Sequence, residues 1–215
     1  MPLKEELSKS VEVRKTGTTT MGIICKDGAV LAAESKSTMG YLIASKESEK
    51  ILQLEDHIAM TIAGASGDAE SLARYMKAEL KLFAIENQRK ISVKGAATLL
   101  ANILQGSKYY PYYVQLIIAG YDSSGARIFT LDPLGSVEEE KKFFSTGSGS
   151  PMALGVLEDA YKEGMTIDEA SKLAMRAIKS AIERDIGSGG KVMDIAVITK
   201  DGVKITRYEL DKLPK

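Results

Sequence analysis

The first place in the chain where residue types and spacing could support catalysis is the junction Gly17-Thr18. Residues 1–17 are polar and charged, whereas the residues that follow Thr18 form an apolar, strand-like stretch. A polar leader that ends in glycine, directly before a threonine that opens a strand, is typical of a processing site. Cleavage of the bond between Gly17 and Thr18 would give Thr18 a free α-amine beside its hydroxyl.

That combination has a clear chemical use. A threonine hydroxyl is a weak nucleophile near neutral pH and needs a base. An N-terminal amine has an ordinary pKa of about 7.7–8.0, so a sizeable neutral fraction can accept the hydroxyl proton, directly or through one water. Gly17 has no Cβ, which permits close approach to its own carbonyl. These residues alone leave a second interpretation open, because threonine runs are also common where strands begin.

The composition narrows the possible functions. The 215 residues include 29 basic and 29 acidic side chains, so charge gives no reason to expect binding to nucleic acid or an anionic membrane. Cys25 is the only cysteine and His57 the only histidine, which disfavours a zinc site, and no metal or cofactor is predicted. His57 lies in a polar segment between two apolar runs and is predicted to be a surface residue in a turn.

The N-terminus does not resemble an export signal. It lacks the apolar core of a secretory signal, and no run of about 18 apolar residues that could span a membrane occurs in the chain. A cytoplasmic location is therefore predicted. The length suits one domain, so we expect residues 18–215 to form a single domain and residues 1–17 to be a pro-segment rather than an export signal.

Turn signals and apolar alternation predict an antiparallel framework. The expected strand pairs are 18–26 with Ala29–Glu34, Lys50–Leu54 with Ile58–Ala63, Val114–Tyr121 with Ala126–Leu131, and Asp194–Lys200 with Val203–Tyr208. Apolar residues at helical spacing predict two helices between the second and third pairs, one after Ser66-Gly67-Asp68 and one from near Ser92.

Two more helices are predicted before the last strand pair. Ser150 as N-cap and Pro151 as first residue open one of them, which Gly164 ends, and Thr166 with Glu169 forms a capping box for the other. This order of elements is not the alternating pattern of a parallel sheet. It predicts an α+β fold, a four-layer αββα sandwich of two antiparallel β-sheets flanked by helix pairs.

The glycine-rich loops do not match nucleotide-binding fingerprints. The stretch Ser145-Thr146-Gly147-Ser148-Gly149-Ser150 could hold phosphate at a helix start, but it lacks both the P-loop pattern and the third glycine of the dinucleotide pattern. A turn between a strand and a helix explains it equally well. Glu34, Lys50 and Asp185 carry no signal when each is taken alone.

Taken together, the chain resembles the β-type catalytic subunits of the 20S proteasome, and archaeal ones most of all. These are N-terminal nucleophile hydrolases, and the resemblance runs from Gly17 to about Tyr208. The stretches that carry it are Gly17-Thr18-Thr19-Thr20-Met21-Gly22, Ala59-Met60-Thr61-Ile62-Ala63-Gly64, Gly67-Asp68-Ala69, Arg74-Tyr75-Met76-Lys77-Ala78-Glu79, Ser145-Thr146-Gly147-Ser148-Gly149-Ser150 and Arg184-Asp185-Ile186-Gly187-Ser188-Gly189-Gly190.

The resemblance implies that residues 1–17 are a propeptide removed by autocatalysis and that residues 18–215 are a single catalytic domain. It also implies a role for each candidate residue. Thr18 would be the nucleophile of a threonine-type endopeptidase, and Lys50 the cation beside its hydroxyl, which lowers the pKa of that hydroxyl. Glu34 would pair with Lys50. The resemblance places Asp185, Ser188 and Ser148 around the α-amine and makes the Gly64 backbone N–H the oxyanion donor.

The resemblance also implies a substrate pocket and partners. The residues expected to shape the pocket or bind the peptide backbone are Ser37, Thr38, Ser48, Leu52, Ile62 and Ser66. Apolar Ile62 at its base predicts cleavage of unfolded polypeptides after hydrophobic residues. The expected assembly stacks two heptameric β rings between two rings of α subunits, with a regulatory ATPase acting through the α ring. Two alternatives stay open, namely a catalytically silent ring subunit and a subunit of a bacterial-type two-ring ATP-dependent protease.

Overall fold

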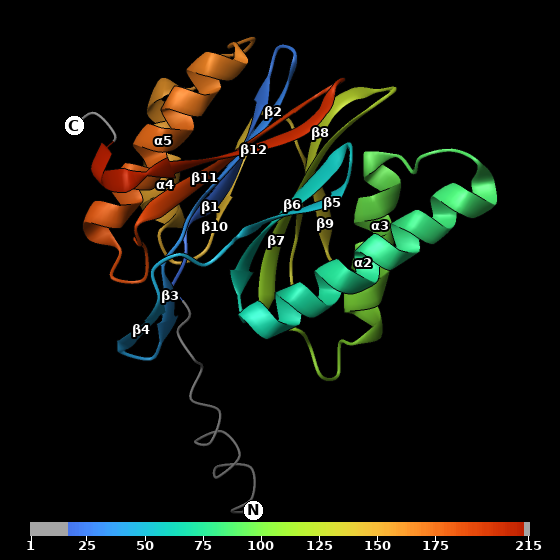
Figure 1. Cartoon of the computed structure of the whole chain (residues 1–215), viewed down its shortest axis with the longest axis horizontal. Helices are drawn as coiled ribbons and strands as arrows, with labels where there is room; N and C mark the ends of the chain where they lie inside the picture. Colours follow the sequence, from blue (N-terminus) through green and yellow to red (C-terminus); the bar gives the residue numbers. More distant parts are fainter. Residues whose placement is uncertain (1–16, 213–215) are drawn as a thin grey trace, which may run out of the picture.

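The computed structural model describes residues 17–212, so the predicted leader lies outside the described residues except for Gly17. Two five-stranded antiparallel sheets pack face to face, and a pair of helices covers the outer face of each (Figure 1). This is the predicted four-layer sandwich. Within the described residues, no helix has both the length and the apolar character needed to cross a membrane.

The first sheet contains the strand that follows Thr18. Its order is β10-β1-β2-β11-β12, with bounds Phe143–Thr146, Thr20–Cys25, Gly28–Glu34, Val192–Thr199 and Gly202–Glu209. Helices α4 (Ser150–Ala160) and α5 (Ile167–Arg184) cover it. The central strand β2 is buried along its whole length, as expected for a strand covered on both faces.

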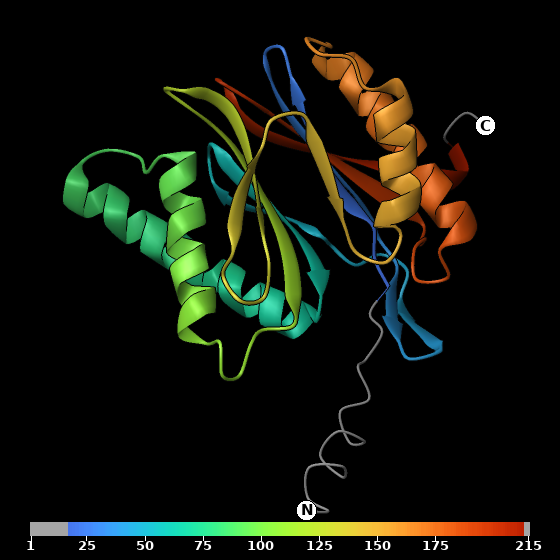
Figure 2. The ribbon, with the colours of Figure 1, turned by 180° about the vertical axis from the view of Figure 1, so that it is seen from behind.

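The second sheet carries the other two helices. Its order is β5-β6-β7-β8-β9, with bounds Ile51–Glu55, Ile58–Gly64, Val114–Asp122, Gly125–Leu131 and Val137–Glu140. Helices α2 (Ser66–Asn87) and α3 (Val93–Gly106) pack on its outer face, as the view from behind also shows (Figure 2). A short 3₁₀ turn, η1 (Leu210–Lys212), follows β12.

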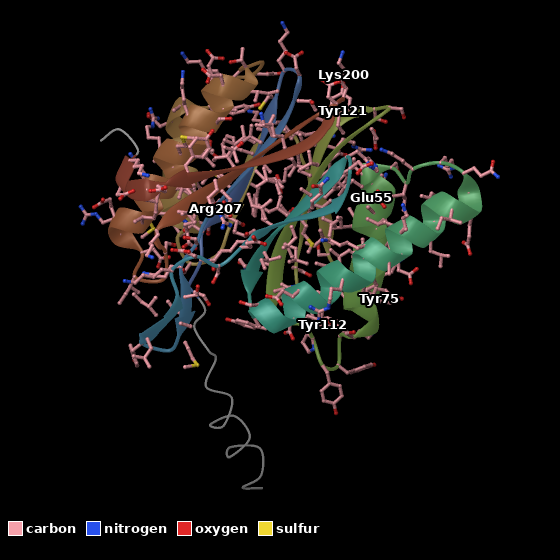
Figure 3. The ribbon with its side chains drawn as sticks, viewed as in Figure 1. Glu55, Tyr75, Tyr112, Tyr121, Lys200 and Arg207 are labelled. Carbon is pink, nitrogen blue, oxygen red and sulfur yellow. The ribbon has the colours of Figure 1, made fainter. Side chains whose placement is uncertain are left out.

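Apolar side chains fill each gap between layers. One cluster lies between the sheets and includes Leu31, Ile117 and Ile198, each fully buried. The other two clusters lie between each sheet and its helices. Figure 3 shows side chains filling the space between the sheets. The loops at one end of this rigid frame therefore start from fixed positions.

A two-stranded sheet projects from the sandwich beside the start of β1. It consists of β3 (Ser37–Met39) and β4 (Leu42–Ser45) and lies at the end of the sandwich where β1 begins (Figure 1). The sequence patterns do not predict these two strands, nor β9 and β10. All four are three or four residues long, which is too short for a clear alternation of apolar and polar residues.

Three local predictions were wrong. The N-cap of α4 is Gly149 rather than Ser150, and α4 ends at Ala160 rather than Gly164 because Tyr161 takes an extended backbone conformation. His57 does lie in a turn between strands, but it is only 8% exposed. The segment before α3 covers it, and its Nε2 lies 2.9 Å from the Ile91 carbonyl oxygen. The capping box at Thr166 and Glu169 is confirmed.

The only cysteine is expected to resist alkylation while the protein is folded. Cys25 is 6% exposed, and its burial, together with the nearby Asp27 charge, raises the pKa of its thiol to about 12. Because the thiolate is the reactive species, iodoacetamide at pH 8 should leave the folded protein unmodified and add one adduct in denaturant. Intact mass measures both states. An adduct on most of the folded chains within minutes would contradict this burial.

Candidate functional site

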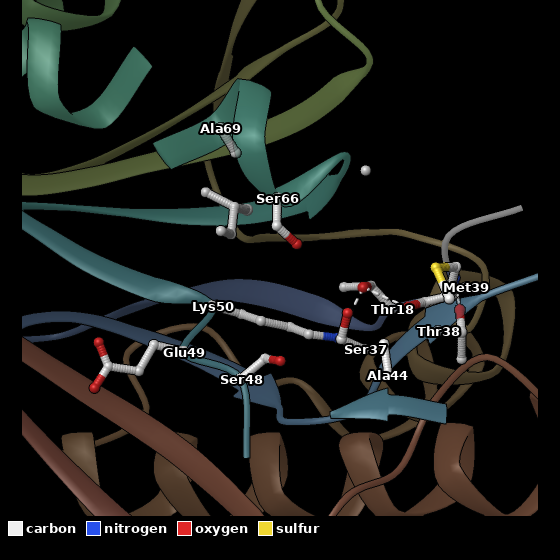
Figure 4. A pocket seen from close by; sticks show the side chains of 13 residues that line it. Thr18, Ser37, Thr38, Met39, Ala44, Ser48, Glu49, Lys50, Ser66 and Ala69 are labelled. Carbon is white, nitrogen blue, oxygen red and sulfur yellow. Dashed lines mark hydrogen bonds between the residues drawn. The ribbon is translucent and has the colours of Figure 1, made fainter. Parts of the chain in front are cut away.

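The hydroxyl of Thr18 lies at the centre of the site. Thr18 precedes β1 and is only 4% exposed. Its Oγ1 accepts a hydrogen bond from Lys50 Nζ at 2.8 Å and donates one to the Gly17 carbonyl oxygen at 2.6 Å. Figure 4 shows the Lys50 side chain extending toward Thr18. The hydroxyl therefore lies between a cation and the carbonyl group of the predicted cleavage site.

Lys50 is held in this position by two further acceptors. Its ammonium donates to Glu34 Oε1 and to the Lys36 carbonyl oxygen, so with Thr18 Oγ1 all three of its N–H groups have partners. The positions of the two large sheets explain why Glu34 and Lys50 lie next to each other. Glu34 ends β2, which pairs with β1, and Lys50 directly precedes β5 in the opposite sheet.

The Glu34 carboxylate is buried and fully satisfied. Besides Lys50, its Oε1 accepts the Thr19 N–H at 3.1 Å, and its Oε2 accepts the N–H groups of Lys36 at 2.6 Å and Gly189 at 3.0 Å. Glu34 is 1% exposed and Lys50 5%. A buried ion pair is stable only with this kind of additional hydrogen bonding.

Burial also prepares this pair for proton transfer. It lowers the pKa of the Lys50 ammonium, because removal from water disfavours the charged form, and attraction to Glu34 opposes this effect. Burial raises the pKa of Glu34, against the hydrogen bonds and charge of Lys50 and the backbone N–H donors. A lysine with a lowered pKa can exchange a proton with the neighbouring hydroxyl more readily than a solvated one.

A second network surrounds the nitrogen of Thr18. The Thr18 N–H donates to Ser148 Oγ at 3.2 Å, and that hydroxyl donates to Asp185 Oδ2 at 2.6 Å. Ser188 Oγ donates to the same carboxylate oxygen, also at 2.6 Å. Ser188 Oγ also lies 2.6 Å from Thr19 Oγ1. Cleavage before Thr18 would leave its new amine in contact with this network.

The loop between β10 and α4 approaches Thr18 very closely. Gly147 has φ +90°, and a Cβ placed there would lie 2.2 Å from the Thr18 carbonyl oxygen. The Gly149 N–H donates to that same oxygen at 3.2 Å. The glycines in Ser145–Ser150 thus form a turn, as one interpretation of the sequence expected. The turn also brings Ser148 to Thr18.

A pocket of about 240 Å³ opens beside the Thr18 hydroxyl. Ile62 and Ala69 give it apolar walls, and Ser37, Ser48 and Ser66 add hydroxyl groups. Figure 4 shows Ser37 beside the end of Lys50 that faces Thr18, with Ser66 and Ser48 drawn on opposite sides of the lysine side chain. The remaining lining residues are Gly17, Thr18, Thr38, Met39, Ala44, Glu49, Lys50 and Gly64.

The structure brings nearly all of the sequence-predicted site residues together. The two networks contain Thr18, Lys50, Glu34, Asp185, Ser148 and Ser188, and Gly64 lines the pocket. Five of the six predicted substrate-binding residues also line it. Leu52 does not, because it packs against the core beneath α2 and α3.

Several residues of the site were not foreseen. Thr19, Lys36 and Gly189 contact Glu34 through backbone atoms, which any residue type could supply, so no sequence signal marks them. Met39 and Ala44 lie on or beside the short β3–β4 sheet. Ala69 could have been found, because it lies three residues after Ser66 on the predicted helix and so shares its face.

The family match and the similar curated proteins agree on one protein family. Residues 14–198 match the family described as Proteasome subunit. A protein of Methanocaldococcus fervens named "Proteasome subunit beta" is 51% identical over 194 residues, which cover 90% of this chain and 86% of that protein. Proteins with the same name from Methanohalophilus mahii and Methanothermobacter thermautotrophicus are each 50% identical, covering 92% and 90% of this chain and 94% and 91% of theirs. The chain therefore belongs to the proteasome subunit family.

Proposed function

We propose that the chain is a catalytic β subunit of the 20S proteasome, a protease that uses Thr18 as its nucleophile. One observation carries the proposal. Lys50, fixed by Glu34, donates to the Thr18 hydroxyl, which in turn reaches the carbonyl group of Gly17. The name that the archaeal relatives share supports the assignment.

The first reaction in this proposal is removal of the leader, residues 1–17. Thr18 Oγ1 attacks the Gly17 carbonyl carbon, the Oγ1–C bond forms, and the C–N bond to Thr18 breaks. Lys50 first gives one ammonium proton to Glu34, so that its neutral amine can take the hydroxyl proton and pass it to the departing nitrogen, which becomes the α-amine. Water then hydrolyses the ester, which gives a carboxylate on Gly17 and restores the hydroxyl.

Substrate cleavage repeats the same chemistry with a different carbonyl group. The new α-amine is oriented by Ser148 and Asp185. Together with Lys50 it accepts the hydroxyl proton and returns it to the leaving group. The Gly64 N–H is the proposed donor to the oxyanion, a contact that is typically worth about 2.7–4 kcal/mol in the transition state. An acyl-enzyme ester forms, and water releases it.

The pocket sets the proposed substrate preference. Its apolar walls, Ile62 and Ala69, favour an apolar side chain before the cleaved bond. Thr38 on β3 and Ser66 are proposed to bind an extended peptide through backbone hydrogen bonds, as an added strand would. The proposed assembly is a stack of heptameric rings with α subunits, fed with unfolded polypeptide by an ATPase.

Digestion of an unfolded polypeptide tests the proposal. The chain is assembled with the α subunit of the same organism, freed of its leader, and incubated with a reduced, unfolded protein. Mass spectrometry should find cleavage after apolar residues at least about tenfold more often than after charged ones. Processed particles that leave the polypeptide intact would contradict the proposal, whereas cleavage mainly after charged residues would contradict only the pocket assignment.

A further inference from the structure

Gly17 is hydrogen-bonded through both its N–H and its carbonyl oxygen, although it would be absent from the processed protein. Its N–H donates to Thr38 Oγ1 at 3.1 Å, and its carbonyl oxygen accepts from Thr18 Oγ1 at 2.6 Å. Its Cα also packs directly against the backbone of Gly187, so closely that a Cβ on Gly17 would lie 2.0 Å from the Gly187 Cα. These contacts fix both peptide groups of the last leader residue.

The contact with Thr38 is made by a side chain, not by strand pairing. Thr38 belongs to β3, which pairs with β4 and with no strand of the two large sheets. The β3–β4 sheet thus contacts the last leader residue, Gly17, through the Thr38 hydroxyl group. A Thr-to-Val change would remove this acceptor and keep the shape and the β-branched character of the strand residue.

We propose that Thr38 is a positioning residue for self-cleavage, because its hydroxyl holds the Gly17 amide so that the Gly17 carbonyl faces the Thr18 hydroxyl. This rests on the proposed function and adds to it a role for the Thr38 side chain that acts before the leader is removed. Small displacements of reacting groups are costly in rate, so one hydrogen bond on the residue that carries the cleaved bond has a measurable effect.

The arrangement also couples leader removal to substrate entry. Gly17 and Thr38 both line the pocket, so the leader's last residue occupies space beside the hydroxyl that binds it. Once Gly17 leaves, the Thr38 hydroxyl becomes available on the wall of the pocket. The same residue therefore holds the leader first and faces the substrate afterwards.

The test compares the rate of leader removal with the rate of peptide hydrolysis. Thr38→Val, Thr38→Ser and a matched control, Ser45→Ala, are assembled with α subunits, and intact mass follows leader loss over time. Ser45 lies on the partner strand β4, where its hydroxyl accepts the Glu47 N–H and does not contact Gly17. Each variant is also made as a chain that already begins at Thr18, to measure peptide hydrolysis without self-cleavage.

We expect Thr38→Val to slow leader removal about tenfold, the factor for one lost hydrogen bond that leaves a buried donor unpaired. Thr38→Ser and Ser45→Ala should process within about twofold of the unmodified chain. In chains that begin at Thr18, Thr38→Val should lower peptide hydrolysis by a clearly smaller factor than it lowers leader removal. If Thr38→Val does not assemble, Thr38→Ala replaces it and is interpreted in the same way.

Four results would overturn the proposal. Leader removal by Thr38→Val at the unmodified rate would show that the hydroxyl has no positioning role, while the proposed function would stand. Equal losses in Thr38→Val and Thr38→Ser, or equal losses of processing and hydrolysis, would show a general effect on the strand. Retention of the leader by the unmodified chain in complete particles would overturn this proposal and the proposed function together.

Discussion

Thr18→Ala is expected to keep its leader and to hydrolyse no peptide when it is assembled with α subunits. Both proposed reactions use the same hydroxyl, and removal of a catalytic nucleophile typically costs a factor of about 10⁴–10⁶ in rate. The structure gives no second hydroxyl within the described residues that contacts both Lys50 and Gly17. Intact mass measures the leader, and a fluorogenic peptide with an apolar residue before the cleaved bond measures hydrolysis.

Two variants control this experiment. Thr18→Ser keeps a hydroxyl at the same position and should retain leader removal and measurable hydrolysis. Thr98→Ala removes a threonine methyl and hydroxyl from the exposed side of α3 and should behave as the unmodified chain does. Peptide hydrolysis by Thr18→Ala above the background of an uncatalysed control would refute the assignment of the nucleophile.

Lys50→Met is expected to lower activity severely and to destabilise the fold. Without the ammonium the Thr18 hydroxyl loses its cationic neighbour, and the loss of such a group lowers rates by about 10²–10⁴. The buried Glu34 carboxylate would also lose its countercharge. Breaking a buried ion pair from one side costs about 3–5 kcal/mol in the free energy of unfolding, which chemical denaturation can measure.

The double variant Glu34→Gln, Lys50→Met separates these two effects. It removes both buried charges, so the free energy of unfolding should recover part of the loss, although an amide at position 34 keeps only one of the two oxygens that accept backbone N–H groups. Activity should stay low. Lys172→Met is the matched control, because Lys172 pairs with Asp168 on the exposed face of α5 and should change stability far less. A Lys50→Met protein with unmodified activity would remove Lys50 from the mechanism, and a double variant less stable than Lys50→Met would contradict the ion-pair argument.

The layered fold was predictable because its long elements carry strong periodic patterns. Strands such as β7 and β11 are eight or nine residues long, and α5 has a capping box and a continuous apolar stripe. The short strands were not predictable, because pairing with neighbours rather than sequence pattern stabilises them. His57 was misplaced for a similar reason, since a polar turn sequence does not reveal that the segment at Ile91 crosses it.

The site was predictable from side-chain chemistry only in part. Thr18 and its α-amine suggested a nucleophile, but the residues alone did not connect Glu34, Lys50 and Asp185 with it, and their resemblance to a known family made that connection. Fold geometry then determined which atoms meet. The backbone donors to Glu34 and the close approach of Gly147 to Thr18 depend on loop paths, which no residue type specifies.

The most direct test of the central claim is the intact mass of the chain after assembly with the α subunit of the same organism. The account predicts a loss equal to residues 1–17, so that Thr18 becomes the first residue. The same mass decrease should be absent from Thr18→Ala particles prepared in parallel. A chain that retains its full mass in complete particles would contradict the account and would favour a catalytically silent ring subunit.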